Sequence, residues 1–222
     1  MRKSVISEWN GLNANVKGRK EFVKRLILAS GSPRRQELLA MLGIPFEVII
    51  SDAEEIITHT SPAKVTEELS RCKAEAVAHQ VTDAIVIGAD TVVSVDDRIL
   101  GKPKDKEEAR DMIALLQGRS HMVYTGVTIL EVDAEGGICG HTFLEETRVF
   151  VASMNEKEIA EYIASSEPYD KAGAYGIQGS FGKFVERIDG DYYNVVGLPV
   201  HHLYTELNKI NMGLGNHSLS KV

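Results

Sequence analysis

The sequence predicts an α/β protein whose core is a mixed, strongly twisted sheet flanked by helices. Strand and helix signals alternate along the chain, which is typical of α/β domains. Two long strand signals surround the turn Glu135-Gly136-Gly137, which indicates an antiparallel hairpin in the same sheet. Repeats and low-complexity linkers are absent from the 222 residues, so we expect residues 26–210 to form a single domain.

Apolar runs and cap residues define the first elements. The run 26–29 is typical of a buried strand, and Ser32 and Pro33 are favoured at the start of a helix that stops at Gly43. Apolar periodicity then predicts a strand over 46–50, a helix over 62–79 and a strand over 84–95.

Turns and caps organise the second half. Asp96-Asp97 marks a hairpin turn, Asp105 and Glu108 form a capping box, and Asn155 with Glu158 caps a later helix. We expect helices over 106–116, 156–164 and 199–207, strands over 122–132 and 138–151, and a hairpin of 184–188 with 192–196 across Asp189-Gly190.

Composition limits the function classes. Hydrophobic residues make up 43% and charged residues 26%, and the net charge is -7. This balance argues against a nucleic-acid polymer or an anionic membrane surface as partner, so a polyphosphate ligand needs a local basic pocket. Cys72 and Cys139 show neither metal-ligand nor disulfide spacing, and no apolar stretch resembles a signal peptide or membrane span. We therefore expect a cytoplasmic protein with a polar extension over 1–25 and a frayed tail over 211–222.

The segment Ser30-Gly31-Ser32-Pro33-Arg34-Arg35 has the features of an anion site. A strand end, a helix N-terminus and two guanidinium groups come together there, and guanidinium groups suit phosphate oxygens. The alternative is an ordinary strand–helix turn with solvated arginines.

Single charged residues indicate a functional site less specifically than this segment does. Asp90 interrupts a buried strand after Gly88-Ala89, and a carboxylate there is costly unless a cation or a reacting group meets it. The alternative for Asp90 is a helix or turn cap, or a pair with a structural lysine. Taken alone, Lys73 and Lys102 are expected to be ordinary solvated lysines. Glu55 could supply a carboxylate to a metal ion, but adjacent acidic residues are common in loops.

The stretch from Pro168 to Gly179 is rich in glycine and alanine, which allows close approach of a ligand. Tyr175 offers a face for stacking, and the Gln178 amide can donate to and accept from a base edge. A flexible surface loop is the alternative. Walker A, dinucleotide-fingerprint, nucleophile-elbow and zinc patterns are absent, and His121 is expected to pack at a strand start.

Together, Ser30–Arg35, Gly88-Ala89-Asp90-Thr91, Gly101-Lys102-Pro103 and the stretch 170–179 resemble the Maf family of nucleoside triphosphate pyrophosphatases, over about residues 26–207. The resemblance implies a two-lobed fold with a central cleft, related to the inosine triphosphate pyrophosphatases. It implies hydrolysis of a nucleoside triphosphate to the monophosphate plus pyrophosphate, helped by a divalent metal cation, Mg²⁺ or Mn²⁺. A homodimer is a common assembly in this family.

The resemblance also implies residue roles. Asp90 matches the catalytic acid, taken as general base for the attacking water, and Glu55 an acidic position near metal and water. Whether Asp90 acts as base, metal ligand or both stays open. The implied substrate-binding residues, five basic positions among them, are Ser30, Ser32, Arg34, Arg35, Lys73, Thr91, Lys102, Lys171 and Gln178.

The motif Gly176-Ile177-Gln178-Gly179 resembles the subgroup that acts on dTTP and UTP, as part of housecleaning of the nucleotide pool. Pyrophosphatases for 7-methyl-GTP, CTP or modified pyrimidines are alternatives within the family. A nucleotide-binding regulator of cell division or septum formation is the alternative from another class.

Overall fold

The computed structural model describes residues 24–211, and the predictions for the N-terminal extension and the C-terminal tail lie almost entirely outside them. Within these residues one sheet has the order β2-β1-β3-β5-β6-β7, with β4 paired to β3. β1 is parallel to β2 and β3, and the other pairs are antiparallel. The strands are β1 (Arg25–Leu28), β2 (Phe46–Val48), β3 (Ala84–Val95), β4 (Arg98–Leu100), β5 (Ser120–Val132), β6 (Ile138–Val151) and β7 (Val185–Asp189). The mixed α/β sheet is thereby confirmed.

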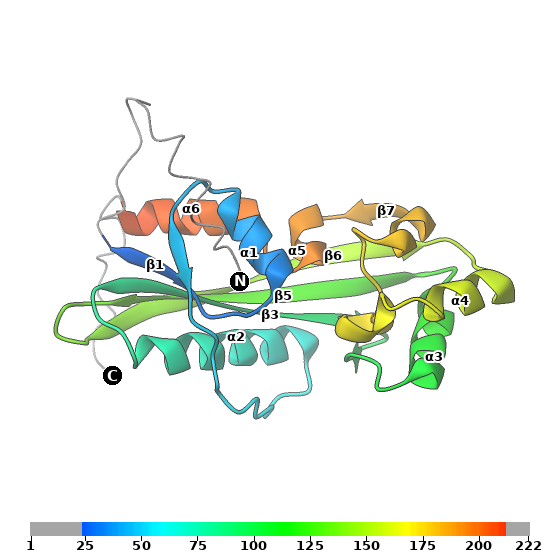
Figure 1. Ribbon diagram of the computed structural model, residues 1–222, viewed down its shortest axis with the longest axis horizontal. Coiled ribbons are helices and arrows are strands. Elements are labelled where there is room, and N and C mark those ends of the chain that lie inside the picture. The colour runs from blue at the N-terminus through cyan, green and yellow to red at the C-terminus, as the bar shows by residue number, and fades with distance from the viewer. Residues whose placement is uncertain (1–23, 212–222) are drawn as a thin grey trace, which may run out of the picture.

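Helices cover both faces of the sheet (Figure 1). α2 lies along one face, α1 and α6 lie on the other, and α3 and α4 pack at the far end of the long strands. The α-helices are α1 (Pro33–Ala40), α2 (Pro62–Ala78), α3 (Lys106–Leu116), α4 (Glu156–Ile163), α5 (Tyr192–Val196) and α6 (Val200–Asn211). In the described chain, three short 3₁₀ turns lie between α4 and β7, namely η3 (Pro168–Asp170), η4 (Ala172–Ala174) and η5 (Ser180–Phe184).

Alternation along β3 decides which side chains meet which helix. Ile85 and Ile87 pack with α1 and α6, whereas Val86 packs with α2. Continuing this period, Asp90 falls on the α2 side and Thr91 on the α1 side. The strand therefore places two neighbouring polar residues on opposite faces of the sheet, Asp90 toward α2 and Thr91 toward α1.

Two glycines let α2 approach the sheet closely. A Cβ on Gly88 would lie 2.2 Å from the carbonyl oxygen of Ser70, and one on Gly126 would lie 2.4 Å from that of Thr66. Because β3 and β5 pair Asp90 with Gly126, this contact lies directly beside the predicted catalytic residue.

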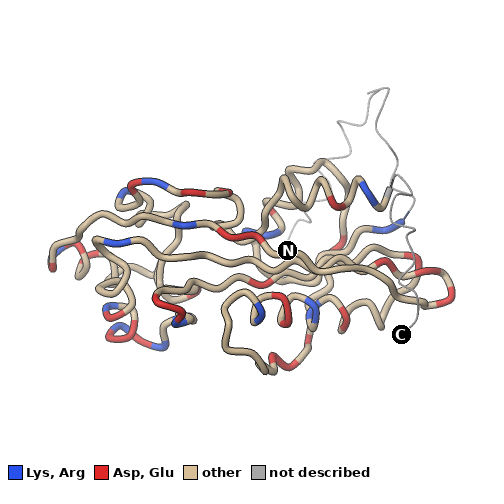
Figure 2. The backbone as a smooth tube through the Cα atoms, turned by 180° about the vertical axis from the view of Figure 1, so that it is seen from behind, with Lys and Arg blue, Asp and Glu red and all other residues tan. Residues whose placement is uncertain are grey.

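Hydrophobic clusters lie toward both ends of the long strands and mark two lobes. In one lobe, a cluster joins the end of β3 to α3 and α4. In the other, two clusters pack the start of β3 against α1 and α6 on one face of the sheet and against α2 on the other. β3 and β5 run through both lobes and connect them (Figure 1). Most of the length of these strands carries no charge, whereas charged residues gather on the helices and loops (Figure 2).

The edge of β3 is open between the lobes. On the side away from β5, β1 pairs with β3 as far as Ile87, and β4 pairs with it from Val93 onward. Among the described residues no strand pairs with this side of residues 88–92. Ligands of open α/β sheets bind beyond the carboxyl ends of parallel strands, and this gap lies at the carboxyl end of β1.

The predicted hairpin after residue 184 is wrong. Tyr192–Val196 is the helix α5, and β7 pairs with β6 instead. The Asp191 side chain caps α5 by accepting a hydrogen bond from the Tyr193 amide at 2.8 Å. β-Branched and aromatic residues favoured a strand, but the cap and the burial of Val196 against the core outweighed that preference.

Candidate active site

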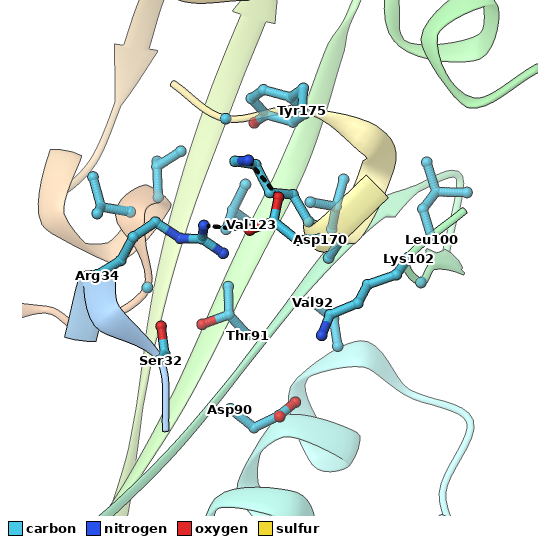
Figure 3. Close-up of a pocket in the computed structure, with 18 of the residues that line it drawn as sticks. Ser32, Arg34, Asp90, Thr91, Val92, Leu100, Lys102, Val123, Asp170 and Tyr175 are labelled. Carbon is cyan, nitrogen blue, oxygen red and sulfur yellow. Dashed lines mark hydrogen bonds and ion pairs between the residues drawn. The ribbon is translucent and has the colours of Figure 1, made fainter. Parts of the chain in front are cut away.

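A cavity of about 520 Å³ occupies the open edge of β3, and both lobes line it (Figure 3). A neighbouring cavity of about 380 Å³ lies at the carboxyl end of β1 and shares several charged residues with it. Ten sequence-predicted site residues line the larger cavity, namely Ser32, Arg34, Arg35, Glu55, Lys73, Asp90, Thr91, Lys102, Lys171 and Gln178. The eleventh, Ser30, lines the smaller one.

The turn before α1 is folded around its own serines. Ser32 caps the helix, since its hydroxyl accepts from the Arg35 amide, and Pro33 follows as the first helical residue. The buried Ser30 hydroxyl accepts from the Ser32 amide at 3.3 Å. This arrangement aims the helix N-terminus and two guanidinium groups at the cavities.

Arg35 is fixed by neutral acceptors. Its Nε donates to the carbonyl of Gly197 at 2.9 Å and its Nη2 to the Thr91 hydroxyl at 3.1 Å. The Thr91 hydroxyl also bonds that of Thr125 on β5 at 2.9 Å. Burial lowers the pKa of Arg35 from its usual value, and the nearby Asp90 charge opposes that shift. The guanidinium is therefore held in place without a carboxylate in contact with it.

Lys73 joins the two predicted acidic residues. Its ammonium lies 2.6 Å from an oxygen of Asp90 and 2.8 Å from one of Glu55. Asp90 and Lys73 are both largely buried, whereas Glu55 is more than half exposed. The Asp90 carboxylate, which would be costly to bury alone, is thus paired with a cation. Lys73 lies on α2, the helix that can approach the sheet closely because of Gly88.

Asp170 was not predicted as a site residue. One oxygen accepts from Arg34 at 3.0 Å, and the other accepts from Lys171 at 2.5 Å. Partial burial favours its neutral form, but the hydrogen bonds from Lys171 and Arg34 outweigh burial and hold the pKa of Asp170 below its usual range. Arg34 comes from α1 and Asp170 from η3, so this ion pair spans the cavity (Figure 3).

Lys102 and Gln178 are exposed side chains that line the same cavity. Within residues 24–211 neither makes a side-chain hydrogen bond or an ion pair, so both are free to meet a ligand. Lys102 extends into the cavity from the segment after β4 (Figure 3).

Tyr175, which was expected to offer a face for stacking, lines the larger cavity but is only 5% exposed. Its ring packs against Phe181 and its hydroxyl bonds Nε2 of His121 at 2.7 Å, so the stacking role stays a prediction. His121 is buried at the start of β5, as expected. An apolar wall also lines the larger cavity, formed by Val65, Leu69, Val92, Ile99, Leu100, Val123, Val195 and Val196.

A divalent cation fits the donor set at Asp90 and Glu55. Both carboxylates contact one ammonium, so both lie within reach of a single ion. In the described part of the chain no three His, Cys, Asp or Glu side chains form a complete metal site. Mg²⁺ commonly takes one or two carboxylates and fills its shell with substrate phosphates and water, which suits this pair.

Two other sequence features have simple outcomes. Among the described residues no helix is long and apolar enough to cross a membrane. Both cysteines are free thiols.

Comparison with known proteins identifies the family of this chain. The model of the Maf-like protein family matches residues 25–210. A Bacillus cereus protein named dTTP/UTP pyrophosphatase is 50% identical over 193 residues, which cover 86% of this chain and 93% of that protein. A protein of the same name from Lachnoclostridium phytofermentans is 48% identical over 191 residues, covering 86% and 97%. Among solved structures, the Staphylococcus aureus Ham1 protein is 16% identical with a TM-score of 0.47, covering 84% of this chain and all of that one. On the family match and these identities, the chain belongs to the family of Maf-like proteins.

Proposed function

We propose that this protein hydrolyses nucleoside triphosphates, with dTTP and UTP preferred, to the monophosphate and pyrophosphate. The observation that carries the proposal is one cavity lined by five basic side chains, two acidic residues joined on Lys73, and the free amide of Gln178. The names of the relatives that are about 50% identical supply the preferred bases.

The two ends of the substrate would meet different parts of the site. The smaller cavity is lined by the Ser30–Arg35 turn, Lys73 and Lys102, so the phosphates are assigned to it. The larger cavity adds the apolar wall and Gln178, which suit the planar base and its polar edge. A pyrimidine edge needs both a donor and an acceptor, and an amide provides both.

Hydrolysis needs a water to attack the α-phosphorus, while the bond from that atom to the α–β bridging oxygen breaks and pyrophosphate leaves with the oxygen. Asp90 is proposed to orient this water and receive its proton. Arg34, Arg35 and Lys102 are proposed to stabilise the charge that develops on the pyrophosphate.

A divalent cation is proposed at Asp90 and Glu55, where Mg²⁺ or Mn²⁺ would add positive charge at the phosphate oxygens. Lys73 holds the same two carboxylates in position before the ion and substrate bind.

The test is release of pyrophosphate and monophosphate from a panel of ribo-, deoxy- and modified nucleoside triphosphates, with Mg²⁺ and then Mn²⁺. Preferential release from dTTP and UTP supports the proposal. Preference for 7-methyl-GTP or inosine triphosphate keeps the reaction and refutes the base assignment, and binding without release refutes the enzyme.

Two variants assign the residues. Asp90→Asn is expected to lower turnover by about 10²–10⁴-fold while nucleotide binding remains. Its matched control is Asp111→Asn, an exposed aspartate on α3 outside the cavities, which should turn over normally. Gln178→Glu is expected to change the order of preferred bases, and an equal loss for every base would contradict its role.

A further inference from the structure

The segment that carries Gln178 has little regular structure of its own. Its turn is closed by a hydrogen bond from the Gly179 amide to the carbonyl of Gly176, at 3.1 Å. Gln178 itself is exposed. Something outside the turn must therefore fix the position of this amide if it is to distinguish one base from another.

Glu167 fastens the segment just beyond Gln178. One carboxylate oxygen accepts from both the amide and the hydroxyl of Ser180, each at 2.8 Å. The other accepts from the Tyr162 hydroxyl at 3.3 Å and the Phe181 amide at 3.4 Å. Four donors thus converge on one side chain that is absent from the lining of either cavity.

Glu167 also fastens the segment before the turn. Its backbone carbonyl accepts from the Lys171 ammonium at 2.7 Å. A Cβ on Gly176 would lie 2.7 Å from Cε of Lys171, and one on Gly179 would lie 2.1 Å from a carboxylate oxygen of Glu167. A Cβ at either glycine would therefore displace the Lys171 or the Glu167 side chain from its present position.

The Glu167 carboxyl is in the form that this arrangement needs. Burial favours protonation, but the hydrogen bonds from Ser180, Phe181 and Tyr162 outweigh it and lower the pKa of Glu167 below its usual value. A carboxylate accepts at both oxygens, whereas a protonated carboxyl or an amide places a donor among groups that themselves donate. Replacing the carboxylate by an amide therefore disrupts the anchor with almost no change in size.

We propose that Glu167 is a positioning residue for base selection, holding the turn that presents Gln178 although it does not touch the substrate. This inference rests on the proposed function, because it assigns Gln178 to the base. It predicts that the phosphate end of the site is indifferent to the Glu167 side chain, since the link to Lys171 uses the backbone carbonyl.

The experiment compares Glu167→Gln with Glu161→Gln. Glu161 lies exposed on α4, and within residues 24–211 its one ion pair is with Lys157, at 3.8 Å, so it is the matched control. For each protein we would measure kcat/KM and equilibrium affinity for UTP and CTP, and inhibition by tripolyphosphate, which has no base. Circular dichroism and the melting temperature establish that each variant is folded.

For Glu167→Gln, the UTP-to-CTP ratio is expected to fall about tenfold or more, because a small displacement of a recognition group costs up to about 10²-fold. Inhibition by tripolyphosphate should stay within about twofold, and Glu161→Gln should match the wild type. Ser180→Ala removes one donor and keeps the amide, so a smaller loss of the same ratio is expected. It also supplies the answer if Glu167→Gln does not fold.

An unchanged ratio in Ser180→Ala and Glu167→Gln would overturn the inference, as would an equal loss for UTP, CTP and tripolyphosphate. A wild type that binds UTP in preference to CTP without cleaving it would refute the proposed function alone. The ratio of UTP to CTP affinity in the variants would then test the role of Glu167. A wild type without any base preference would overturn the inference even if it cleaves every triphosphate.

Discussion

The close contact between α2 and β3 makes Gly88 a sensitive position although no ligand touches it. In Gly88→Ala the new Cβ would lie 2.2 Å from the Ser70 carbonyl oxygen, 2.8 Å from the Ala74 amide nitrogen and 2.9 Å from the Ala74 Cβ. Two of these atoms are backbone and cannot rotate away. The helix must therefore move outward by about 1 Å to reach ordinary contact distances.

The free energy of unfolding is expected to fall by about 2 kcal/mol. Overpacking a well-packed site costs about 1–3 kcal/mol, and backbone neighbours place this site at the upper end. Removing a glycine from a strand returns about 0.5–1 kcal/mol. Because Lys73 precedes Ala74 on the same helix, the shift also disturbs its 2.6 Å contact with Asp90. Turnover of the folded variant should fall by up to about 10²-fold.

Urea unfolding followed by circular dichroism measures the first effect, and pyrophosphate release well below the unfolding midpoint measures the second. Gly101→Ala is the control for stability, since a Cβ there meets no atom within 4 Å. Its free energy of unfolding should lie within about 0.5 kcal/mol of the wild type. If Gly88→Ala were as stable and as active as the wild type, α2 would not lie as close to β3 as described, and the placement of Lys73 would need revision.

Three further substitutions test separate parts of the molecule. Glu55→Gln should raise the Mg²⁺ concentration needed for half-maximal activity about tenfold or more, whereas Glu54→Gln beside it should not; equal curves would remove Glu55 from the metal site. Lys102→Gln should raise KM and weaken its dependence on salt, because an exposed cation acts through screened charge; an unchanged salt dependence would exclude a phosphate contact. Burial lowers the pKa of His121 from 6.5 to about 4. As pH falls through this window the unfolded state binds a proton that the folded state does not, so stability present above pH 6.5 is lost toward pH 4. Urea titrations should show this loss, of order 3 kcal/mol, in the wild type and much less of it in His121→Gln; parallel curves would contradict the shift.

Local signals in the sequence predicted most of the fold correctly. The Ser32 cap and the Asn155–Glu158 capping box form as expected because they involve residues two or three positions apart. The strand β3 was also predicted correctly, because two apolar runs surround the small residues that precede Asp90. The strand predicted over Tyr192–Val196 was wrong because local residue types did not decide the structure there. These residue types favour a strand, and only packing against the core favours a helix.

The residues brought to the cavity were predicted from ordered motifs, but their mutual contacts were not. Asp170 and Arg34 are 136 positions apart, and no periodicity or spacing indicates that pair. Glu167 lies 13 positions from Ser180 across three short turns, a path that sequence patterns do not define. The Tyr175 hydroxyl likewise bonds His121, which lies 54 positions away at the start of β5. Such contacts depend on how the lobes pack, and packing is a property of the whole chain.

The pairing of charges in the cavity explains how an acidic protein keeps a basic site ready for an anion. Asp90 and Glu55 both form ion pairs with Lys73, and Asp170 forms ion pairs with Arg34 and Lys171. These pairs limit repulsion among the cations and hold them in place, which lowers the cost of organising the site when a ligand binds.

In the proposed function, a triphosphate would exchange partners with these carboxylates as it binds. Lys102, which makes no ion pair within the described chain, and Arg35, held by neutral acceptors, can receive phosphate without first giving up a carboxylate. Under the same proposal, Arg34 would leave Asp170, and a cation at Asp90 and Glu55 would take the place of Lys73. Since phosphate alone does not compensate two carboxylates for the loss of Lys73, a divalent cation and the triphosphate are expected to bind with positive coupling, each raising the affinity of the other.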